Sequence, residues 1–421
     1  MTQQQLSHYS FDNGLTLVGH HMPWLQSAAY AISVSAGSRY DDAEKVGTAN
    51  FLCEMVQRGC GDMDSRQYVE ALQMLGMDSS SSAGNYQTHY GGAMIASELA
   101  PSLRIAADML RRPTLPADQL EDGRMVCLQE IASTADDLAQ KAMNAMRARF
   151  YGSPDGRNSD GTIESINRIS LDDLREAHQS LYRPNGMIIA VAGKFDWESL
   201  VDEVGQLFGD WQPKPDPEVA VSPPESGPHH IPFESEQTHI IVGFKGFIVS
   251  EPDFYLNRCA IGVLSDGMSS RLFTEVREKR GLCYTVFASN HMTKNQAGVF
   301  CYSGTSSARA QQTLDVIVEQ LVELGKGITK SELDRLKIQI RSQLVSQQES
   351  CRSRANSINS DWFHLGRLRT LDELNATISS ITVDQVNDFL QRHPPSNFSL
   401  VTLGSNPLEL KEHGIPTTPI T

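Results

Sequence analysis

The sequence lacks the segments typical of membrane-spanning or secreted proteins. No stretch approaches the roughly 20 consecutive apolar residues of a membrane helix. Residues 1–8 contain neither the basic nor the apolar region of a signal peptide. The seven cysteines are odd in number and lack the C-x-x-C spacing of many metal and redox sites. We therefore expect no membrane contact and a location in a reducing compartment, the cytoplasm.

Positive charge and several common catalytic motifs are also scarce. With 51 Asp and Glu against 36 Lys and Arg, the net charge is −15, which argues against a nucleic-acid partner because phosphate binding requires a positive surface. The chain contains no G-x-S-x-G elbow, no phosphate-binding P-loop and no G-x-G-x-x-G fingerprint. None of its twelve His stands four residues from another, so no conventional zinc helix is present.

What the sequence does contain is an internal repeat with an offset of roughly 210 residues. Ser170–Leu174 is echoed by Thr382–Val386, and each copy precedes a short helical stretch and an apolar strand ending in Gly. Two further segments, near Leu115 and Ile328, both open long helices. The Ser and Thr residues are plausible helix N-caps. The repeat indicates a duplicated unit.

The duplication predicts a domain organisation. We expect an N-terminal half at 1–212, a Pro-rich linker at 213–231 and a C-terminal half at 232–421. Strands with partial alternation, such as Ala29–Ser35 and His239–Phe244, are mixed with helices rather than strictly alternating with them. This pattern favours an α+β fold, in which each half has a mainly antiparallel sheet with helices packed on one face.

One segment gives the first indication of function. The segment Gly47-Thr48-Ala49-Asn50-Phe51-Leu52-Cys53-Glu54-Met55 resembles G-x-A-H-F-L-E-H-M, the zinc helix of the pitrilysin/insulinase family of zinc peptidases. In that family two His of H-x-x-E-H hold Zn²⁺ and the Glu acts as general base. Here the three positions hold Asn50, Cys53 and Glu54. Both imidazoles and the base are therefore missing, and we expect no metal in this chain.

The resemblance covers roughly residues 10–405. The stretch Val126–Ile131 is similar to the phrase that carries the family's third zinc ligand, which would make Glu130 a retained ligand position. The stretch Ser270–Tyr284 is similar to S-R-L-F-x-x-V-R-E-x-x-G-L-x-Y, which carries the Arg and Tyr associated with substrate binding. These are Arg277 and Tyr284. The resemblance also implies two homologous halves that face each other like a clamshell.

The degenerate zinc helix has two interpretations. Asn50 is a poor neutral oxygen donor, and Cys53 occupies the position of the base rather than that of a ligand. In the first interpretation these positions are remnants with no metal. In the second, Glu54 and Glu130, with Cys53, form a divergent metal site.

Arg277 and Tyr284 also have two interpretations. A guanidinium and a phenol can donate hydrogen bonds to a peptide carbonyl, and to the oxyanion as charge develops. Alternatively, Arg277 forms a surface ion pair on the Glu-rich segment Thr274–Arg280, and Tyr284 is an ordinary strand residue within Leu282–Val286.

In some two-chain members of the family the zinc motif and the Arg/Tyr pair lie on different polypeptides, and the resemblance therefore implies a division of labour between two chains. We expect a non-catalytic, substrate-binding subunit of a heterodimeric zinc metallopeptidase that cleaves peptides. The zinc and the general base would come from a homologous partner with an intact H-x-x-E-H motif. The alternatives are a peptidase-like scaffold, a peptide-binding homodimer, and an independent peptidase with a remodelled metal site.

Overall fold

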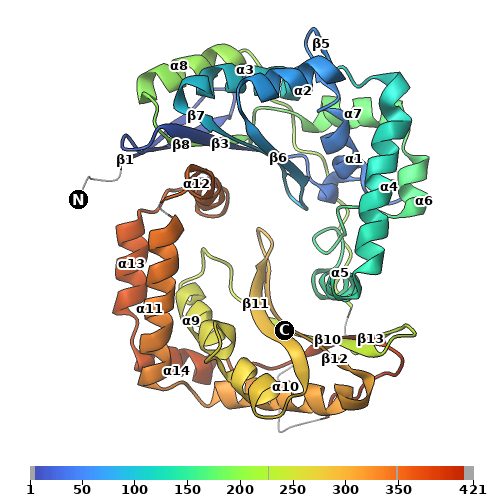
Figure 1. Ribbon diagram of the computed structural model, residues 1–421, viewed down its shortest axis with the longest axis vertical. Helices are drawn as coiled ribbons and strands as arrows, with labels where there is room; N and C mark the ends of the chain where they lie inside the picture. Colours follow the sequence, from blue (N-terminus) through green and yellow to red (C-terminus); the bar gives the residue numbers. More distant parts are fainter. Residues whose placement is uncertain (1–4, 226, 348, 412–421) are drawn as a thin grey trace. The chain divides into compact units, whose positions relative to one another are not determined.

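The computed structural model describes residues 5–225, 227–347 and 349–411 (Figure 1). The chain divides into two compact units, which we call the first and second unit. The first contains residues 1–133, 157–220 and 345–371, and the second contains residues 134–156, 221–344 and 372–421. Neither unit is continuous in sequence. Each half of the sequence lends one segment to the unit built mainly by the other half.

The first unit is built on a six-stranded sheet. Its strands, in spatial order, are β1 (Gln5–Ser10), β2 (Thr16–His21), β8 (Ile188–Gly193), β3 (Ser27–Val34), β7 (Thr88–Ile95) and β6 (Asp78–Ala83). All neighbours are antiparallel except the β2–β8 pair. A two-stranded hairpin is formed separately by β4 (Gly59–Cys60) and β5 (Met63–Asp64). One face of the large sheet packs against a core to which the following helices contribute: α1 (Thr48–Met55), α2 (Ser65–Met74), α3 (Leu99–Arg111), α4 (Leu120–Asp136), α6 (Ile163–Arg168), α7 (Leu171–Leu181) and α8 (Trp197–Phe208).

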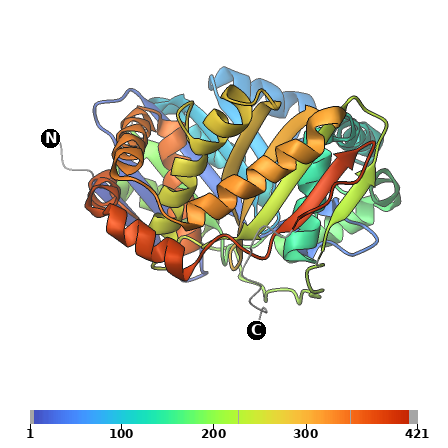
Figure 2. The ribbon, with the colours of Figure 1, turned by 90° about the horizontal axis from the view of Figure 1, so that it is seen from below.

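The second unit repeats this topology with five strands. Their spatial order is β11 (Cys283–Met292), β12 (Ala297–Ser306), β10 (Gln237–Lys245), β13 (Ser399–Gly404) and β9 (His229–Pro232), and only β9–β13 is parallel. Figures 1 and 2 show α10 on the face of this sheet opposite α5. The helices of this unit are α5 (Leu138–Tyr151), α9 (Phe254–Ser265), α10 (Ala310–Gly325), α11 (Lys330–Gln347), α13 (Leu371–Ser380) and α14 (Val383–Arg392).

The matching strand orders confirm the predicted α+β class and the duplication. Strands β2, β8, β3, β7 and β6 correspond in order to β9, β13, β10, β12 and β11. The two helices that open the echoed segments, α7 and α14, begin with capping boxes at Ser170 and Thr382, the residues expected as N-caps. Each side-chain oxygen accepts a hydrogen bond from a backbone N–H that has no partner within its helix.

Each sheet also has a helix packed on its second face, whereas the sequence predicts helices on one face only. In the first sheet Ile189 and Val191 face the large core, whereas the intervening Ala190 faces α12 (Cys351–Leu365). In the second sheet α5 occupies the equivalent position over β10 and β13. Because α12 comes from the C-terminal half and α5 from the N-terminal half, the compact units differ from contiguous halves in these two segments.

Polar contacts fix α12 on its sheet. Asn359 donates from Nδ2 to the backbone oxygen of Ala31 (3.0 Å), and Arg354 donates from Nε to Nδ1 of His20 (3.1 Å). Both Arg354 and His20 are buried. Burial, together with the nearby Arg354 charge, lowers the pKa of His20 to about 4. His20 is therefore neutral when it accepts from the guanidinium.

Between α8 and β9 the described chain forms neither a helix nor a strand, although it is not detached from the first unit. The buried Arg183 donates to Asp216 Oδ1 (2.6 Å) and to the backbone oxygen of Pro215 (3.1 Å).

Among the helices in the described part of the chain, none combines the length and the apolar character needed to cross a membrane.

We predict that His20 makes the free energy of unfolding depend on pH. The pKa of His20 is about 4 in the folded protein and 6.5, the ordinary value, in the unfolded chain. The contribution of the neutral imidazole to the free energy of unfolding is therefore fully present above pH 6.5 and is lost as the pH falls towards 4. The loss should reach about 3 kcal/mol near pH 4. A His20→Gln variant, whose amide oxygen can accept from Arg354, should show a smaller decline in urea unfolding between pH 6.5 and 4.5. Identical declines in the two proteins would contradict this account.

Candidate functional site

The degenerate zinc helix, α1, begins at a glycine that is required by the backbone. Gly47 has φ = +101°, a conformation that L-residues rarely adopt. The carboxylate of Asp41 accepts hydrogen bonds from the backbone N–H groups of Gly47 (2.8 Å) and Ala49 (3.0 Å). Burial raises the pKa of Asp41 to about 7, although these hydrogen bonds oppose the rise. Phe51 and Met55 bury the inner side of the helix in the core.

The outer side of α1 carries two of the three zinc-motif positions. Asn50 donates from Nδ2 to Glu130 Oε2 on α4, at 3.0 Å. Glu54 accepts two hydrogen bonds at Oε1 from Arg58, one turn further along, at 2.8 and 3.0 Å. Arg58 was not among the predicted site residues, although a Glu–Arg pair four residues apart can be found in the sequence. The structure thus brings Asn50 and Glu130 together and gives Glu54 a cationic partner.

The third position, Cys53, faces the protein interior. Burial raises the pKa of its thiol to about 11, and the hydroxyl groups of Tyr90 and Ser81 lie beside it. A cysteine binds zinc or attacks a substrate as the thiolate, and this thiol is neutral near pH 7. Cys53 is therefore suited to packing rather than to the role of ligand or nucleophile.

These residues do not fit a catalytic zinc site. Such a site needs three protein donors and an open position for water. Here the Asn50 amide N–H points at Glu130, Arg58 neutralises Glu54, and Cys53 is buried and protonated. The described residues also contain no cluster of three or more His, Cys, Asp or Glu arranged to hold a metal. The donor chemistry argues against the divergent metal site of Glu54, Glu130 and Cys53.

Arg277 and Tyr284 lie together in the second unit. Arg277 is on the helical turn Phe273–Glu278, and Tyr284 is near the start of β11. The central guanidinium carbon of Arg277 lies 5.0 Å from the centroid of the Tyr284 ring and 4.8 Å from that of Phe273. Both distances are within the range of cation–π attraction. The structure therefore adds Phe273, four residues before Arg277, to the pair predicted from sequence.

Two irregularities of the backbone coincide at this point. The turn Phe273–Glu278 is a π-helix, and the pairing of β11 with β12 shifts between Cys283 and Thr285. Tyr284 is the extra residue of that bulge, and its side chain is 81% exposed. π-Helices and bulges are both frequent next to functional sites. Here they place an exposed phenol beside a guanidinium.

The structure does not show the surface ion pair considered for Arg277, because its guanidinium forms neither a hydrogen bond nor an ion pair among the described residues. Two acids lie on the same turn. Glu275 accepts from Lys279 (2.6 Å) and Arg280 (2.7 Å), and Glu278 forms no ion pair with Arg277 in the described chain. The N–H groups of the guanidinium therefore have no protein acceptor in the described part of the chain.

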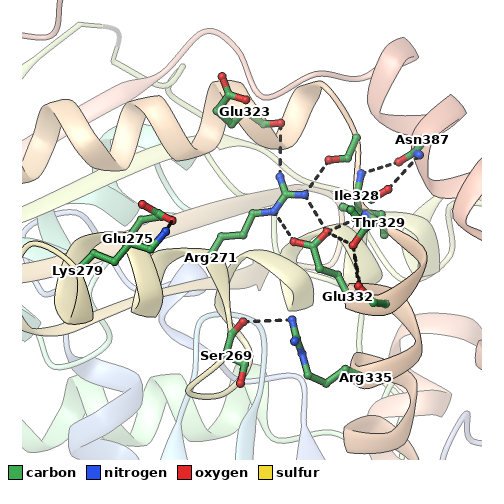
Figure 3. Close-up of polar contacts among 12 residues, drawn as sticks. Ser269, Arg271, Glu275, Lys279, Glu323, Ile328, Thr329, Glu332, Arg335 and Asn387 are labelled. Atoms are coloured by element: carbon green, nitrogen blue, oxygen red, sulfur yellow. Dashed lines mark hydrogen bonds and ion pairs between the residues drawn. The ribbon is translucent and has the colours of Figure 1, made fainter.

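Arg271, from the same motif, anchors the turn that carries Arg277 (Figure 3). It donates to both carboxylate oxygens of Glu332 on α11, at 2.8 and 3.0 Å, and to the backbone oxygen of Gly327 (2.9 Å). Burial opposes ionisation of Glu332, yet the hydrogen bonds from Arg271 and Thr329 outweigh it and lower the pKa to about 2. The pair stays charged at neutral pH and fixes the turn to α11.

Comparisons with known proteins match the chain to peptidase profiles and to curated relatives. A profile described as "Insulinase (Peptidase family M16)" matches residues 18–157, and one described as "Peptidase M16 inactive domain" matches residues 168–340. An uncharacterized zinc protease of Bacillus subtilis, YmxG, is 27% identical over 402 residues, covering 94% of this chain and 98% of the relative. An uncharacterized zinc protease of Mycobacterium leprae is also 27% identical, over 93% of this chain and 90% of the relative.

Solved structures show the same fold. A peptidase M16 inactive domain from Pseudomonas fluorescens superposes with a TM-score of 0.87 at 23% identity, covering 96% of this chain and 99% of the other. A protease from Helicobacter pylori gives 0.86 at 18% identity, with 95% and 99% covered. With both profiles matching successive parts of the sequence, the chain belongs to the M16 (insulinase) family of peptidases.

Proposed function

We propose that this chain is the non-catalytic, substrate-binding subunit of a two-chain metallopeptidase. The observation that carries the proposal is the state of Arg277, whose guanidinium lies within cation–π distance of both Phe273 and Tyr284 while its N–H groups have no acceptor within the described chain. The relatives named as zinc proteases support peptides as the substrate class. The partner would be a homologue with an intact H-x-x-E-H motif.

The two sites suggest which groups each chain supplies. Arg277 and Tyr284 can donate hydrogen bonds to a peptide carbonyl and strengthen them as negative charge develops on its oxygen. On α1, the Glu54–Arg58 pair and the Asn50–Glu130 hydrogen bond occupy the groups that a metal would need. Zinc and the general base therefore fall to the partner in this proposal, and peptide binding falls to this chain.

The competing hypothesis is a scaffold, or a homodimer, without proteolysis. The scaffold hypothesis gives no reason why one arginine of this segment should differ from the others. Arg271 forms an ion pair with Glu332 and Arg280 forms one with Glu275, whereas Arg277 has no ion pair among the described residues. This contrast favours a ligand-binding role.

Removing either donor should slow peptide cleavage by the assembled complex. Arg277→Ala and Tyr284→Phe each delete a hydrogen-bond donor to the reacting carbonyl, so kcat/KM should fall roughly 10- to 1,000-fold. The zinc content of the complex should stay unchanged, because neither residue binds metal in this account. Both quantities can be measured on purified complex with a fluorogenic peptide and by elemental analysis.

Arg280→Gln is the matched control for this experiment. It removes one positive charge from the same segment, three residues from Arg277, and breaks hydrogen bonds to the carboxylate and the backbone oxygen of Glu275. Its kcat/KM should stay within about twofold of wild type. Unaltered turnover in both the Arg277 and the Tyr284 variants would exclude the proposed binding role.

Restoring the two imidazoles should restore zinc binding to this chain. Asn50→His with Glu54→His would supply two ligands on one face of α1 and leave Glu130 as the third. After zinc loading and gel filtration, the double variant should retain about one zinc per chain and the wild type less than about 0.1. Stoichiometric zinc on the wild-type chain would instead mean that Glu54 and Glu130 form a metal site.

A further inference from the structure

Two aromatic rings lie within cation–π distance of the guanidinium of Arg277. A guanidinium is flat, with two faces and a rim of N–H donors. Phe273 lies 4.8 Å and Tyr284 5.0 Å from its central carbon, measured to the ring centroids. Two aromatic rings thus occupy its immediate surroundings, while the rim has no acceptor in the described part of the chain. We call this arrangement of Phe273, Arg277 and Tyr284 the aromatic clamp.

The clamp depends on both backbone irregularities. Phe273 and Arg277 are four residues apart on the π-helical turn, so their side chains lie on the same side of it. The bulge at Tyr284 supplies an extra residue that projects from the edge strand β11. Tyr284 therefore reaches Arg277 from β11, whereas Phe273 reaches it from the turn. With one ring on each element, the rotation of the guanidinium is limited before a ligand binds.

No carboxylate of the described chain forms an ion pair with Arg277, and this includes Glu278 of the same turn. Glu275 is occupied by Lys279 and Arg280, and Glu332 is occupied by Arg271. A neutral carbonyl oxygen can use one or two N–H groups of Arg277 but leaves its charge uncompensated. A carboxylate matches two parallel N–H donors and neutralises the charge, and such paired contacts are among the strongest hydrogen bonds in proteins.

We propose that Phe273 is a positioning residue that fixes Arg277 edge-on, and that the clamp selects peptides carrying a carboxylate. This inference rests on the proposed function, since it assumes that Arg277 and Tyr284 bind peptide, and it adds the chemical class of substrate. The carboxylate is either the C-terminus of the peptide or an acidic side chain. Phe273 acts through Arg277 and does not itself donate to the substrate.

Three decapeptides of Gly, Ser and Ala, each labelled at its N-terminus with dansyl, a fluorophore that is uncharged at neutral pH, test the proposal. The first ends in a free carboxylate, the second in an amide, and the third in an amide but with one central Glu. Binding to the full-length chain is measured by fluorescence anisotropy at low ionic strength, where charged contacts are least screened. Wild type should bind at least one carboxylate peptide about 10-fold more tightly than the neutral amide peptide. Which of the two binds tightly identifies the source of the carboxylate.

Phe273→Leu should reduce that preference to about twofold while leaving the affinity for the neutral peptide nearly unchanged. Phe273→Tyr keeps the ring and should retain the preference, which a merely structural role of Phe273 would not require. Arg280→Gln, which removes the same charge without touching the clamp, should also retain it. Near-ultraviolet circular dichroism checks that each variant is folded.

Two results would overturn the inference. Equal affinity of wild type for all three peptides excludes selection of a carboxylate, and a full preference in Phe273→Leu excludes the role of Phe273. Arg277→Ala separates this failure from that of the proposed function. If the variant loses affinity for neutral and acidic peptides alike, Arg277 binds the peptide backbone, and only the carboxylate inference fails. If it loses affinity for none of them, both proposals fail.

Discussion

The need to cover both faces of each sheet is the constraint on which the rest of this structure depends. Strands such as β8 are apolar on both faces, since Ile189 and Val191 face one core and Ala190 and Ala192 face the other. A single layer of helices leaves one of those faces exposed, at a cost of about 25 cal/mol per Å² of apolar surface. In each unit the missing cover is one helix, α12 or α5, contributed by the other half of the sequence. The exchange makes each unit depend on both halves of the chain for its core.

The two sites differ in whether their charged side chains have partners within the described chain. On α1 every charged group has a partner: Arg58 compensates Glu54, and Glu130 accepts from Asn50. In the segment around the turn at 273–278, Arg271 and Arg280 are paired, whereas Arg277 has no ion pair among the described residues. A buried or half-buried group without a partner costs free energy unless a ligand satisfies it. Chemistry that depends on the protein's own unsatisfied groups is therefore expected around Arg277 rather than around Asn50.

Much of the fold could be predicted from the sequence, because the signals are local. The capping residues Ser170 and Thr382 mark equivalent helices, and apolar runs ending in Gly mark β8 and β13. The exchange of α5 and α12 could not be predicted, because an amphipathic helix shows which of its sides is buried but not which sheet buries it. The contiguous boundaries at 212 and 232 rest on the repeat and on the Pro-rich stretch between its copies, and neither carries information about this exchange.

The candidate site could be predicted as a set of residues but not as a geometry. The motif around Ser270–Tyr284 identifies Arg277 and Tyr284, and their juxtaposition is present in the structure. The aromatic clamp depends on a π-helical turn and a strand bulge. Both are set by the register of backbone hydrogen bonds, which the sequence pattern does not predict. Arg58, by contrast, was within reach of a sequence argument, because Glu54 stands one turn before it.

The most direct test of the central claim is the mass of the native complex measured together with its zinc. The chain is isolated from its own cells and analysed by native mass spectrometry and elemental analysis. The account predicts a complex of about twice the 46.5 kDa subunit mass, with a second, distinct chain and about one zinc bound to that partner. A zinc-free homodimer or monomer would contradict the two-chain peptidase. Zinc bound to this chain itself would contradict the assignment of Asn50, Cys53 and Glu54 as positions that no longer hold metal.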